Sequence, residues 1–391
     1  MNFEEIKDKE QKYMMHTYGR FQTALVSGKG ASAKGADGKD YIDFTSGIGV
    51  NSLGYCDEGW VKAVTSQAAA IQHISNLYYS PLQVKVAEKL CSLTGMDKVF
   101  LCNSGAEANE CAIKIARKYS YDKYGIGRQK ILTLVNSFHG RTVTTLAATG
   151  QDVFHNFFFP FTEGFEYVTA NDTDDFKAHI SDEICAVFIE LIQGEGGVMP
   201  LSEEFVSEIA KVCSEKDILL MIDEVQTGVA RTGTFYCYEQ YGIKPDVVTS
   251  AKGLGGGLPI GACLCNEKLS SVMTPGTHGT TFGGNPIACA AANEVLSRVA
   301  TNEFLADVCK KGEYFREKLS AMPNVKEIRG KGMMIGIVTE KDNAKEIAAK
   351  CVDAGLLILT AKNLLRLLPP LTITYDEIDK GLKILQSVME A

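Results

Sequence analysis

Strand-length apolar runs recur between about residue 95 and residue 265, and they limit the possible folds of this chain more than any other feature. Most of the runs are uninterrupted, as expected for strands buried on both faces of a largely parallel sheet. Amphipathic patterns over residues 107–120 and 203–216 predict helices between them. The sequence therefore predicts an α/β domain with crossover helices. Its strands are expected at residues 98–102, 130–135, 186–190, 218–223, 246–250 and 261–265.

The two ends of the chain have a different pattern. Asp37 and Gly38 form a turn signal between short extended pieces, which predicts a hairpin within residues 30–44. After about residue 295 the pattern becomes helix, strand, helix, with the strand over residues 325–338. We expect residues 51–290 to form a large domain, residues 291–391 to form a small α+β domain, and residues 1–50 to join the small one.

Composition excludes several classes of protein. The net charge is −8 and no region is strongly basic, which argues against a nucleic-acid partner. No apolar run approaches the roughly 18 residues that span a bilayer, and the charged N-terminal segment lacks the apolar core of a signal peptide. Twelve cysteines form no CxxC pair and six histidines lack metal-ligand spacing, so we expect buried free thiols, no metal site and a cytoplasmic location.

Chemically useful residues follow the predicted strands. In open α/β sheets, ligands bind at the carboxyl ends of the strands. Ser104, Gly105 and Ala106 follow the first strand where a helix begins, and such a helix start favours an anion, although it can be only a cap. The residues after the later strands are, in chain order, Phe138, His139 and Arg141, then Gln193 and Glu195, then Asp223, and finally Lys252.

One cofactor accounts for this set of residues. Pyridoxal phosphate needs an amine for its aldehyde, a carboxylate beside its pyridine nitrogen, an anion cradle and an aromatic face. Lys252, Asp223, the segment 104–106 and Phe138 supply one each. Singly, Asp223 could be a helix cap, Phe138 a core residue and Lys252 a solvated loop charge, but the combination favours the cofactor.

The glycines around Lys252 exclude two other phosphate sites. A phosphate-clamping lysine would require GxxxxGK[ST], which is absent. Gly255, Gly257 and Gly261 have GxGxxxG spacing and precede a strand, so they do not form a dinucleotide fingerprint. We therefore interpret Lys252 as a nucleophile, and the glycines as positions where the chain stays thin and turns sharply.

Several motifs together resemble the class III aminotransferases. The resemblance extends from about residue 20 to residue 374 and implies a type I pyridoxal-phosphate fold, with a mostly parallel seven-stranded sheet in the large domain and a small α+β domain. The motifs are, in order, NSGAEANECAIKIARKY, FHGRT, QGEGGV, IDEVQTGVARTG, AKGLGGGLPIGA, HGTTFGGNPIACAAA and GKGMMIG.

The resemblance also implies roles for individual residues. Lys252 would form the Schiff base, Asp223 would face the pyridine nitrogen, and both would be catalytic. Thr281 would reach the phosphate from a second subunit, which implies a homodimer with shared active sites. The implied cofactor-binding residues are Ser104, Gly105, Ala106, Phe138, Asp223, Glu224, Val225, Gln226, Lys252 and Thr281.

The implied substrate is an amino donor paired with 2-oxoglutarate. The resemblance is greatest to members that act on N-acetylornithine in arginine biosynthesis. It implies that Arg141 binds a substrate carboxylate, where the simpler alternative is a surface ion pair, and that Thr280 contacts substrate. Glu195 and Arg366 would form a gate, in which the glutamate covers the arginine for one substrate and swings aside for the other.

Three departures from the family pattern leave the donor open. They are LGYCDE at residues 53–58, Leu191 after Glu190, and RLLPP at residues 366–370. Other donors compatible with the same chemistry are ornithine, succinylornithine, succinyl-diaminopimelate and 4-aminobutyrate. A decarboxylase or aminomutase, which needs no oxo-acid acceptor, and a non-enzymatic binding protein are more distant alternatives.

Overall fold

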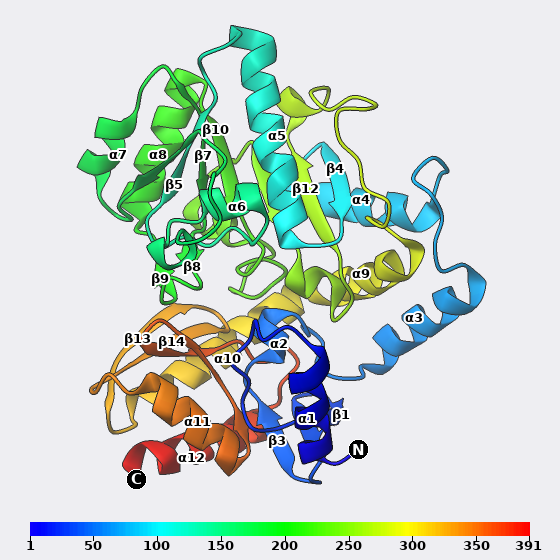
Figure 1. Cartoon of the computed structure of the whole chain (residues 1–391), viewed down its shortest axis with the longest axis vertical. Helices are drawn as coiled ribbons and strands as arrows, with labels where there is room; N and C mark the ends of the chain where they lie inside the picture. The colour runs from blue at the N-terminus through cyan, green and yellow to red at the C-terminus, as the bar shows by residue number, and fades with distance from the viewer.

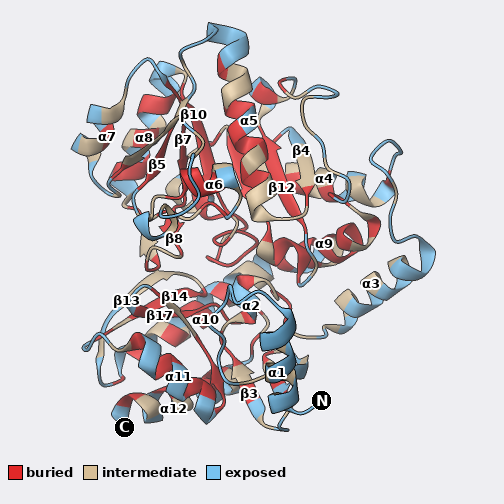
Figure 2. Ribbon diagram, viewed as in Figure 1, coloured by how far each residue is buried: buried red, intermediate tan, exposed pale blue.

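The computed structural model describes all 391 residues, and a seven-stranded sheet forms the centre of its larger lobe (Figure 1). All neighbouring strands are parallel except β12, which is antiparallel to both β4 and β11. The five inner strands are mostly red in Figure 2 because nearly all of their residues are buried, whereas the edge strands β4 and β6 are mostly half-buried. In spatial order they are β4 (Lys98–Cys102), β12 (Gly261–Cys265), β11 (Val247–Ser250), β10 (Leu219–Asp223), β7 (Ile184–Ile189), β5 (Lys130–Leu134) and β6 (Phe165–Val168).

Helices cover this sheet. α5 (Gly105–Tyr124) lies against β12 and β11, and α8 (Glu203–Lys216) lies against β10 and β7. Both helices begin at serine caps, and both were predicted, although α5 extends a few residues beyond the predicted limits. The remaining helices of this lobe are α3 (Glu58–Ala70), α4 (Pro81–Thr94), α6 (Val143–Ala148), α7 (Thr173–His179) and α9 (Pro286–Val299), with short turns η1 (Asp152–Phe154), η2 (Cys237–Tyr241), η3 (Lys252–Gly255) and η4 (Glu267–Leu269).

The smaller lobe combines both ends of the chain, and both termini lie in it (Figure 1). One sheet has the order β1 (Leu25–Lys29), β2 (Ser32–Gly35), β3 (Asp40–Asp43) and β15 (Leu356–Leu357). The hairpin predicted at Asp37 and Gly38 is the β2–β3 pair. The domain limits at residues 50 and 290 stay predictions.

A second sheet and its helices complete this lobe. The sheet has the order β13 (Val325–Lys331), β14 (Met334–Thr339), β17 (Leu364–Leu367) and β16 (Leu359–Ala361). The helices are α1 (Phe3–Tyr13), α2 (Ser46–Gly49), α10 (Asn302–Ser320), α11 (Ala344–Ala354) and α12 (Tyr375–Glu390). No helix combines the length and the apolar character that crossing a membrane requires.

Two details differ from the sequence predictions. The single strand expected over residues 325–338 is the hairpin β13–β14, which turns at Gly332 with φ of +52°. A side chain at Gly332 would come within 2.5 Å of the Thr232 backbone, so glycine is required there. No disulfide forms among the twelve cysteines, but Cys56 and Cys309 are exposed and Cys91 is partly exposed, so not all thiols are buried.

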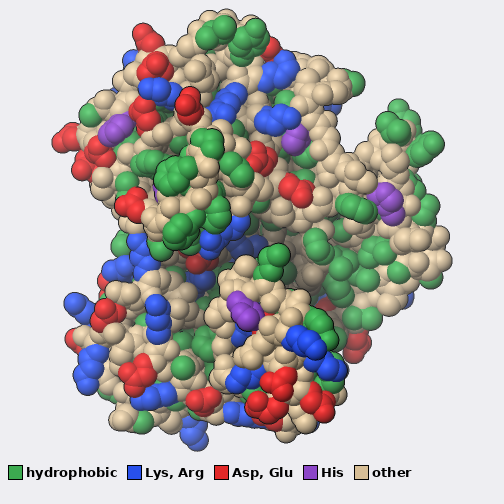
Figure 3. Space-filling model, viewed as in Figure 1, with side chains coloured by type: hydrophobic (Ala, Val, Ile, Leu, Met, Phe, Trp, Pro, Cys, Tyr) green, Lys and Arg blue, Asp and Glu red, His purple; other side chains and the backbone are tan.

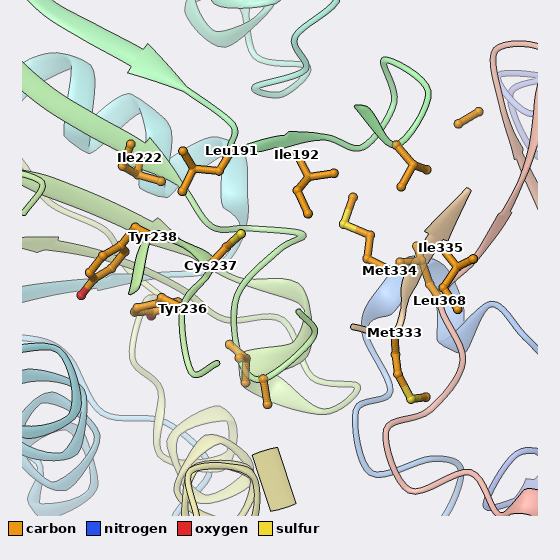
Figure 4. Close-up of a cluster of buried hydrophobic side chains, with 14 of the residues drawn as sticks. Leu191, Ile192, Ile222, Tyr236, Cys237, Tyr238, Met333, Met334, Ile335 and Leu368 are labelled. Atoms are coloured by element: carbon orange, nitrogen blue, oxygen red, sulfur yellow. The ribbon is translucent and has the colours of Figure 1, made fainter. Parts of the chain in front are cut away.

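One hydrophobic core of 67 buried residues joins the two lobes. Figure 4 shows Ile222 from β10 and Leu191 from the larger lobe in the same cluster as Met334 and Leu368 from the smaller lobe. A short pair of strands, β8 (Ile192–Gln193) and β9 (Met199–Pro200), lies at this junction. The carboxyl ends of the sheet strands therefore face a boundary that is held by packing.

Candidate active site

The residues that follow the strands of the main sheet enclose one cavity of about 430 Å³. It contains the segment 103–106 after β4, Phe138 to Arg141 after β5, Glu190 after β7, Asp223 at the end of β10, and Lys252 after β11. Figure 3 shows the surface hollowed between the two lobes, with Lys and Arg side chains at the hollow. Residues far apart in the sequence thus meet where the strand order predicts a ligand site.

Lys252 begins the short turn η3 and is half-buried in the cavity wall. Its φ of +38° lies in the left-handed region, where a residue with a side chain is strained. Burial lowers the pKa of its amine, and the carboxylates of Asp223 and Glu195 oppose that effect. The shift increases the fraction of neutral amine, which is the nucleophilic and basic form.

The glycines beside Lys252 allow close packing of backbone. A side chain at Gly261 would lie 2.3 Å from the carbonyl oxygen of Ser104, so β12 can approach the start of α5 only with glycine there. Gly256 has φ of +58° and packs against Trp60 and Val295. These contacts support the interpretation that the glycines keep the chain thin around the cavity.

Asp223 presents a buried carboxylate to the cavity, and three donors within the chain bind it. Its Oδ1 accepts a hydrogen bond of 3.0 Å from the backbone N–H of Val225. Its Oδ2 accepts bonds of 2.9 Å from Asn109 Nδ2 and 2.9 Å from His139 Nδ1. No helix begins at Asp223, so its interpretation as a helix cap is wrong. A carboxylate held in this way suits a cationic nitrogen in the cavity.

Asn109 was not predicted as a site residue, and His139 was noted at a strand end without a role. Asn109 donates to His139 O at 2.7 Å as well as to Asp223, and the His139 ring stacks on Phe188 with centroids 4.3 Å apart. Asn109 could have been found as a polar residue within the apolar stripe of α5, beside Ala112 and Ile113, which are buried. Nothing in the sequence signals the Phe188 contact.

Glu190 is a second buried carboxyl group that was not predicted to act in the site. It accepts hydrogen bonds from the backbone N–H groups of Phe138 at 2.8 Å and Gly194 at 3.2 Å. Burial raises the pKa of Glu190 to about 7, although the nearby His139 opposes the rise. Glu190 therefore fixes the backbone that carries the Phe138 ring.

The start of α5 supplies anion-binding donors. The Ser104 side chain caps the helix by accepting from Glu107 N, at 3.2 Å. Gly105 and Ala106 are the first residues of the helix, so their N–H groups have no acceptor within it. Both residues line the cavity, where these donors and the helix dipole favour a phosphate. Together with Lys252 and Asp223, they fit the requirements of pyridoxal phosphate.

Arg141 lies at the edge of the cavity and is exposed. Its guanidinium carbon lies 5.5 Å from the centroid of the Phe138 ring. No ion pair or hydrogen bond of its side chain forms within this chain, so the surface ion pair considered as an alternative is absent. Its N–H donors are therefore free for a ligand carboxylate at the edge of the cavity.

Glu195 and Arg366 form an ion pair between the lobes. Arg366 Nη1, on β17, donates to Glu195 Oε1 at 2.6 Å and to Gln226 Oε1 at 3.2 Å. Burial opposes ionisation of Glu195, but the attraction of Arg366 outweighs it and the pKa of Glu195 is lowered. Gln226 lines the cavity, so the pair adjoins it. The sequence separation had left this contact open.

Five predicted residues do not line the cavity, whereas Val225 does. Glu195 and Arg366 adjoin it through Gln226, and the other three, Glu224, Thr280 and Thr281, have different surroundings. The Glu224 carboxylate points into the core, where it accepts from Thr227 Oγ1 at 2.5 Å and from Tyr238 N at 2.8 Å. Thr280 and Thr281 line a second cavity of about 630 Å³. Within one chain, Thr281 therefore does not serve the cavity that contains Lys252.

Comparisons with known proteins agree with this geometry. The family described as "Aminotransferase class-III" matches residues 13–389. Acetylornithine aminotransferase of Haemophilus ducreyi is 49% identical over 100% of this chain and 99% of its own length, and that of Bacillus subtilis is 46% identical over 96% and 97%.

Solved structures show the same relationship. The ornithine aminotransferase of Toxoplasma gondii has a TM-score of 0.95 at 30% identity, covering 100% of this chain and 95% of that one. The N-acetylornithine aminotransferase of Stenotrophomonas maltophilia has a TM-score of 0.85 at 34% identity, covering 98% of both chains. The α/β fold with a mostly parallel seven-stranded sheet is thereby confirmed. On its sequence, its fold and the full length of the match, this chain belongs to the class-III aminotransferase family.

Proposed function

We propose that this protein is an acetylornithine aminotransferase of arginine biosynthesis. It transfers the δ-amino group of N2-acetyl-L-ornithine to 2-oxoglutarate, giving N-acetyl-L-glutamate 5-semialdehyde and glutamate. The observation that carries this proposal is the meeting of Lys252, Asp223 and Arg141 in one cavity, in a chain that is 49% identical to an acetylornithine aminotransferase over its full length.

Pyridoxal 5′-phosphate is the proposed cofactor. When bound, it withdraws electrons from the substrate carbon that carries the amine, which makes the hydrogen on that carbon acidic. Gly105 and Ala106 would hold the phosphate through their N–H groups, Phe138 would pack on the ring, and Asp223 would keep the ring nitrogen protonated. Lys252 moves the substrate proton as general base and acid, and its lowered pKa suits that task.

Arg141 and Arg366 divide the recognition of carboxylates. Arg141 binds the carboxylate of acetylornithine, which is remote from the reacting amine. Because that amine has no carboxylate beside it, Glu195 stays paired with Arg366. Glutamate and 2-oxoglutarate carry a carboxylate next to the reacting carbon, so Glu195 moves aside and Arg366 binds it.

The active form is proposed to be a homodimer in which Thr281 serves the partner's site. Exposed apolar side chains near the second cavity support this proposal, including Leu77, Tyr78, Tyr79 and Phe282. α3 buries none of its residues within the chain, and it is largely pale blue in Figure 2. A second copy that covers this surface would bring Thr281 to the cavity of its partner.

We also propose a cytoplasmic location. Twelve cysteines without a disulfide suit a reducing compartment.

Ornithine is the strongest alternative donor, because the ornithine aminotransferase of T. gondii has the same fold as this chain, with a TM-score of 0.95 at 30% identity. The test is to measure kcat/KM for acetylornithine, ornithine, succinylornithine and 4-aminobutyrate, each with 2-oxoglutarate. We expect kcat/KM for acetylornithine to exceed kcat/KM for ornithine by at least about tenfold. A higher value for ornithine would refute it, and turnover without 2-oxoglutarate would indicate a decarboxylase or aminomutase.

A further inference from the structure

Phe154, in the turn η1, lies against Arg141 at the mouth of the cavity. The Arg141 guanidinium carbon lies 4.0 Å from the centroid of the Phe154 ring, closer than its 5.5 Å separation from Phe138. Phe154 itself is only partly buried and was not among the predicted site residues. The arginine therefore has an aromatic partner but no acceptor within this chain.

An aromatic partner has a specific chemical consequence for Arg141. A carboxylate or carbonyl neighbour would fix the guanidinium by occupying its N–H donors. A ring face attracts the cation through its quadrupole and leaves the five N–H donors, which lie in the guanidinium plane, free. A bidentate carboxylate can then bind without displacing a competing acceptor.

The turn that carries Phe154 is anchored on both sides. Gln151 Nε2 donates to Ser137 O at 3.0 Å, and a ring nitrogen of His155 lies 3.0 Å from Leu146 O. These two contacts tie the residues before and after Phe154 to the segments that carry the site.

The Phe154 ring also meets Phe138 edge to face, with centroids 6.1 Å apart. Residues Phe157, Phe158 and Phe159, farther along the same segment, are exposed and make no such contact with Arg141. Figure 3 shows hydrophobic side chains gathered over α6 and the segment that follows it, beside the hollow.

We propose that Phe154 is a positioning residue that sets the preference for substrates with a carboxylate remote from the reacting amine. It acts by holding the Arg141 guanidinium in a preorganised orientation with its donors free. The inference rests on the proposed role of Arg141. It adds Phe154, which the sequence did not predict, to the residues that determine substrate preference.

The test compares two donors that differ only in that carboxylate. N-acetylputrescine is acetylornithine without its carboxyl group. In the Phe154→Leu holoenzyme, kcat/KM for acetylornithine should fall about fivefold to thirtyfold, mainly through KM, and kcat/KM for N-acetylputrescine should stay within about twofold. Phe154→Tyr should retain near-wild-type values, and Phe158→Leu, which alters an exposed ring of the same segment, should change neither donor.

Equal losses for both donors in Phe154→Leu would overturn the inference, because they would indicate a general packing role. An undiminished preference of Phe154→Leu for acetylornithine over N-acetylputrescine would also overturn it.

A binding measurement keeps this test separate from the proposed function. Glutarate has two carboxylates and no amine, so calorimetry on the holoenzyme measures carboxylate binding without turnover. Phe154→Leu and Arg141→Met should each weaken glutarate binding, and the double variant should be no weaker than Arg141→Met. Additive losses, or no loss in Phe154→Leu, would overturn the inference. If the wild type failed to use acetylornithine, the proposed function would fall and the glutarate result would still decide the role of Phe154.

Discussion

Asn109 is one of three residues that donate hydrogen bonds to the buried carboxylate of Asp223. Its amide donates to Asp223 and to the His139 carbonyl, so Asn109→Ala leaves two buried acceptors short of a donor. We expect the free energy of unfolding to fall by about 1–3 kcal/mol and the dissociation constant for pyridoxal phosphate to rise about tenfold. Urea denaturation and a fluorescence titration measure these effects.

Asn293→Ala is the matched control, because the Asn293 amide donates to Leu82 O and lies outside the cavity. It should change stability without changing cofactor affinity. Unchanged affinity in Asn109→Ala would contradict the role given to Asn109.

Individual site residues were predictable where a strand end positions them. Asp223 ends β10 and Lys252 follows the neighbouring parallel strand β11, so chain order alone brings them to one edge of the sheet. Asn109 and His139 depend on which helix face packs inward and on the Phe188 ring, and these contacts arise only in the folded molecule.

At the scale of elements, Glu224 links the end of β10 to η2. Burial raises the pKa of Glu224 to about 7, above its value of roughly 4.3 in an unfolded chain. The folded state therefore binds the proton more tightly, so this contribution to stability is complete below about pH 4.3 and is lost as pH rises through 7.

Glu224→Gln should remove that dependence on pH. Between pH 5 and pH 7, the free energy of unfolding of the wild type should fall by about 2 kcal/mol more than that of the variant. Urea unfolding of both proteins at pH 5, 6 and 7 measures the difference. Parallel pH profiles would show that the carboxyl group does not titrate in this range.

Elements were predictable where their patterns are continuous. The six apolar runs are all strands of the main sheet, whereas β6 was missed because its residues are mostly half-buried and no long apolar run marks it. The β13–β14 turn was missed because the tight approach of Gly332 to Thr232 is a tertiary contact.

At the scale of the whole molecule, the Glu195–Arg366 pair spans the two lobes. Glu195→Gln removes the charge that covers Arg366 and leaves a side chain of similar shape. We expect KM for glutamate to fall severalfold and kcat/KM for acetylornithine to fall by about tenfold, because Arg366 is then always free to bind a carboxylate. Steady-state kinetics in both directions measures these values. The gate would be contradicted if kcat/KM rose for both donors or fell for both.

The proposed homodimer predicts complementation between defective subunits. Lys252→Ala and Thr281→Asp subunits should each be inactive as homodimers. After they are mixed, dissociated and reassembled, half of the dimers are hybrids, and one of the two sites in each hybrid has both residues intact. Activity should return to about one quarter of the wild-type value. No recovery, with hybrids verified by mass spectrometry, would contradict a shared site.

The arrangement of the lobes was only partly predictable. The pairing of β3 with β15 joins segments about three hundred residues apart, and no local sequence pattern predicts such a pairing. The Glu195–Arg366 contact likewise depends on how the lobes pack against each other across the common core.

The most direct measurement is to treat the holoenzyme with borohydride and identify the modified peptide by mass spectrometry. Reduction makes the bond between the cofactor and its lysine permanent. We predict one cofactor per chain, on Lys252, and none in Lys252→Ala. Modification of another lysine, or a wild-type protein that binds no pyridoxal phosphate, would contradict it.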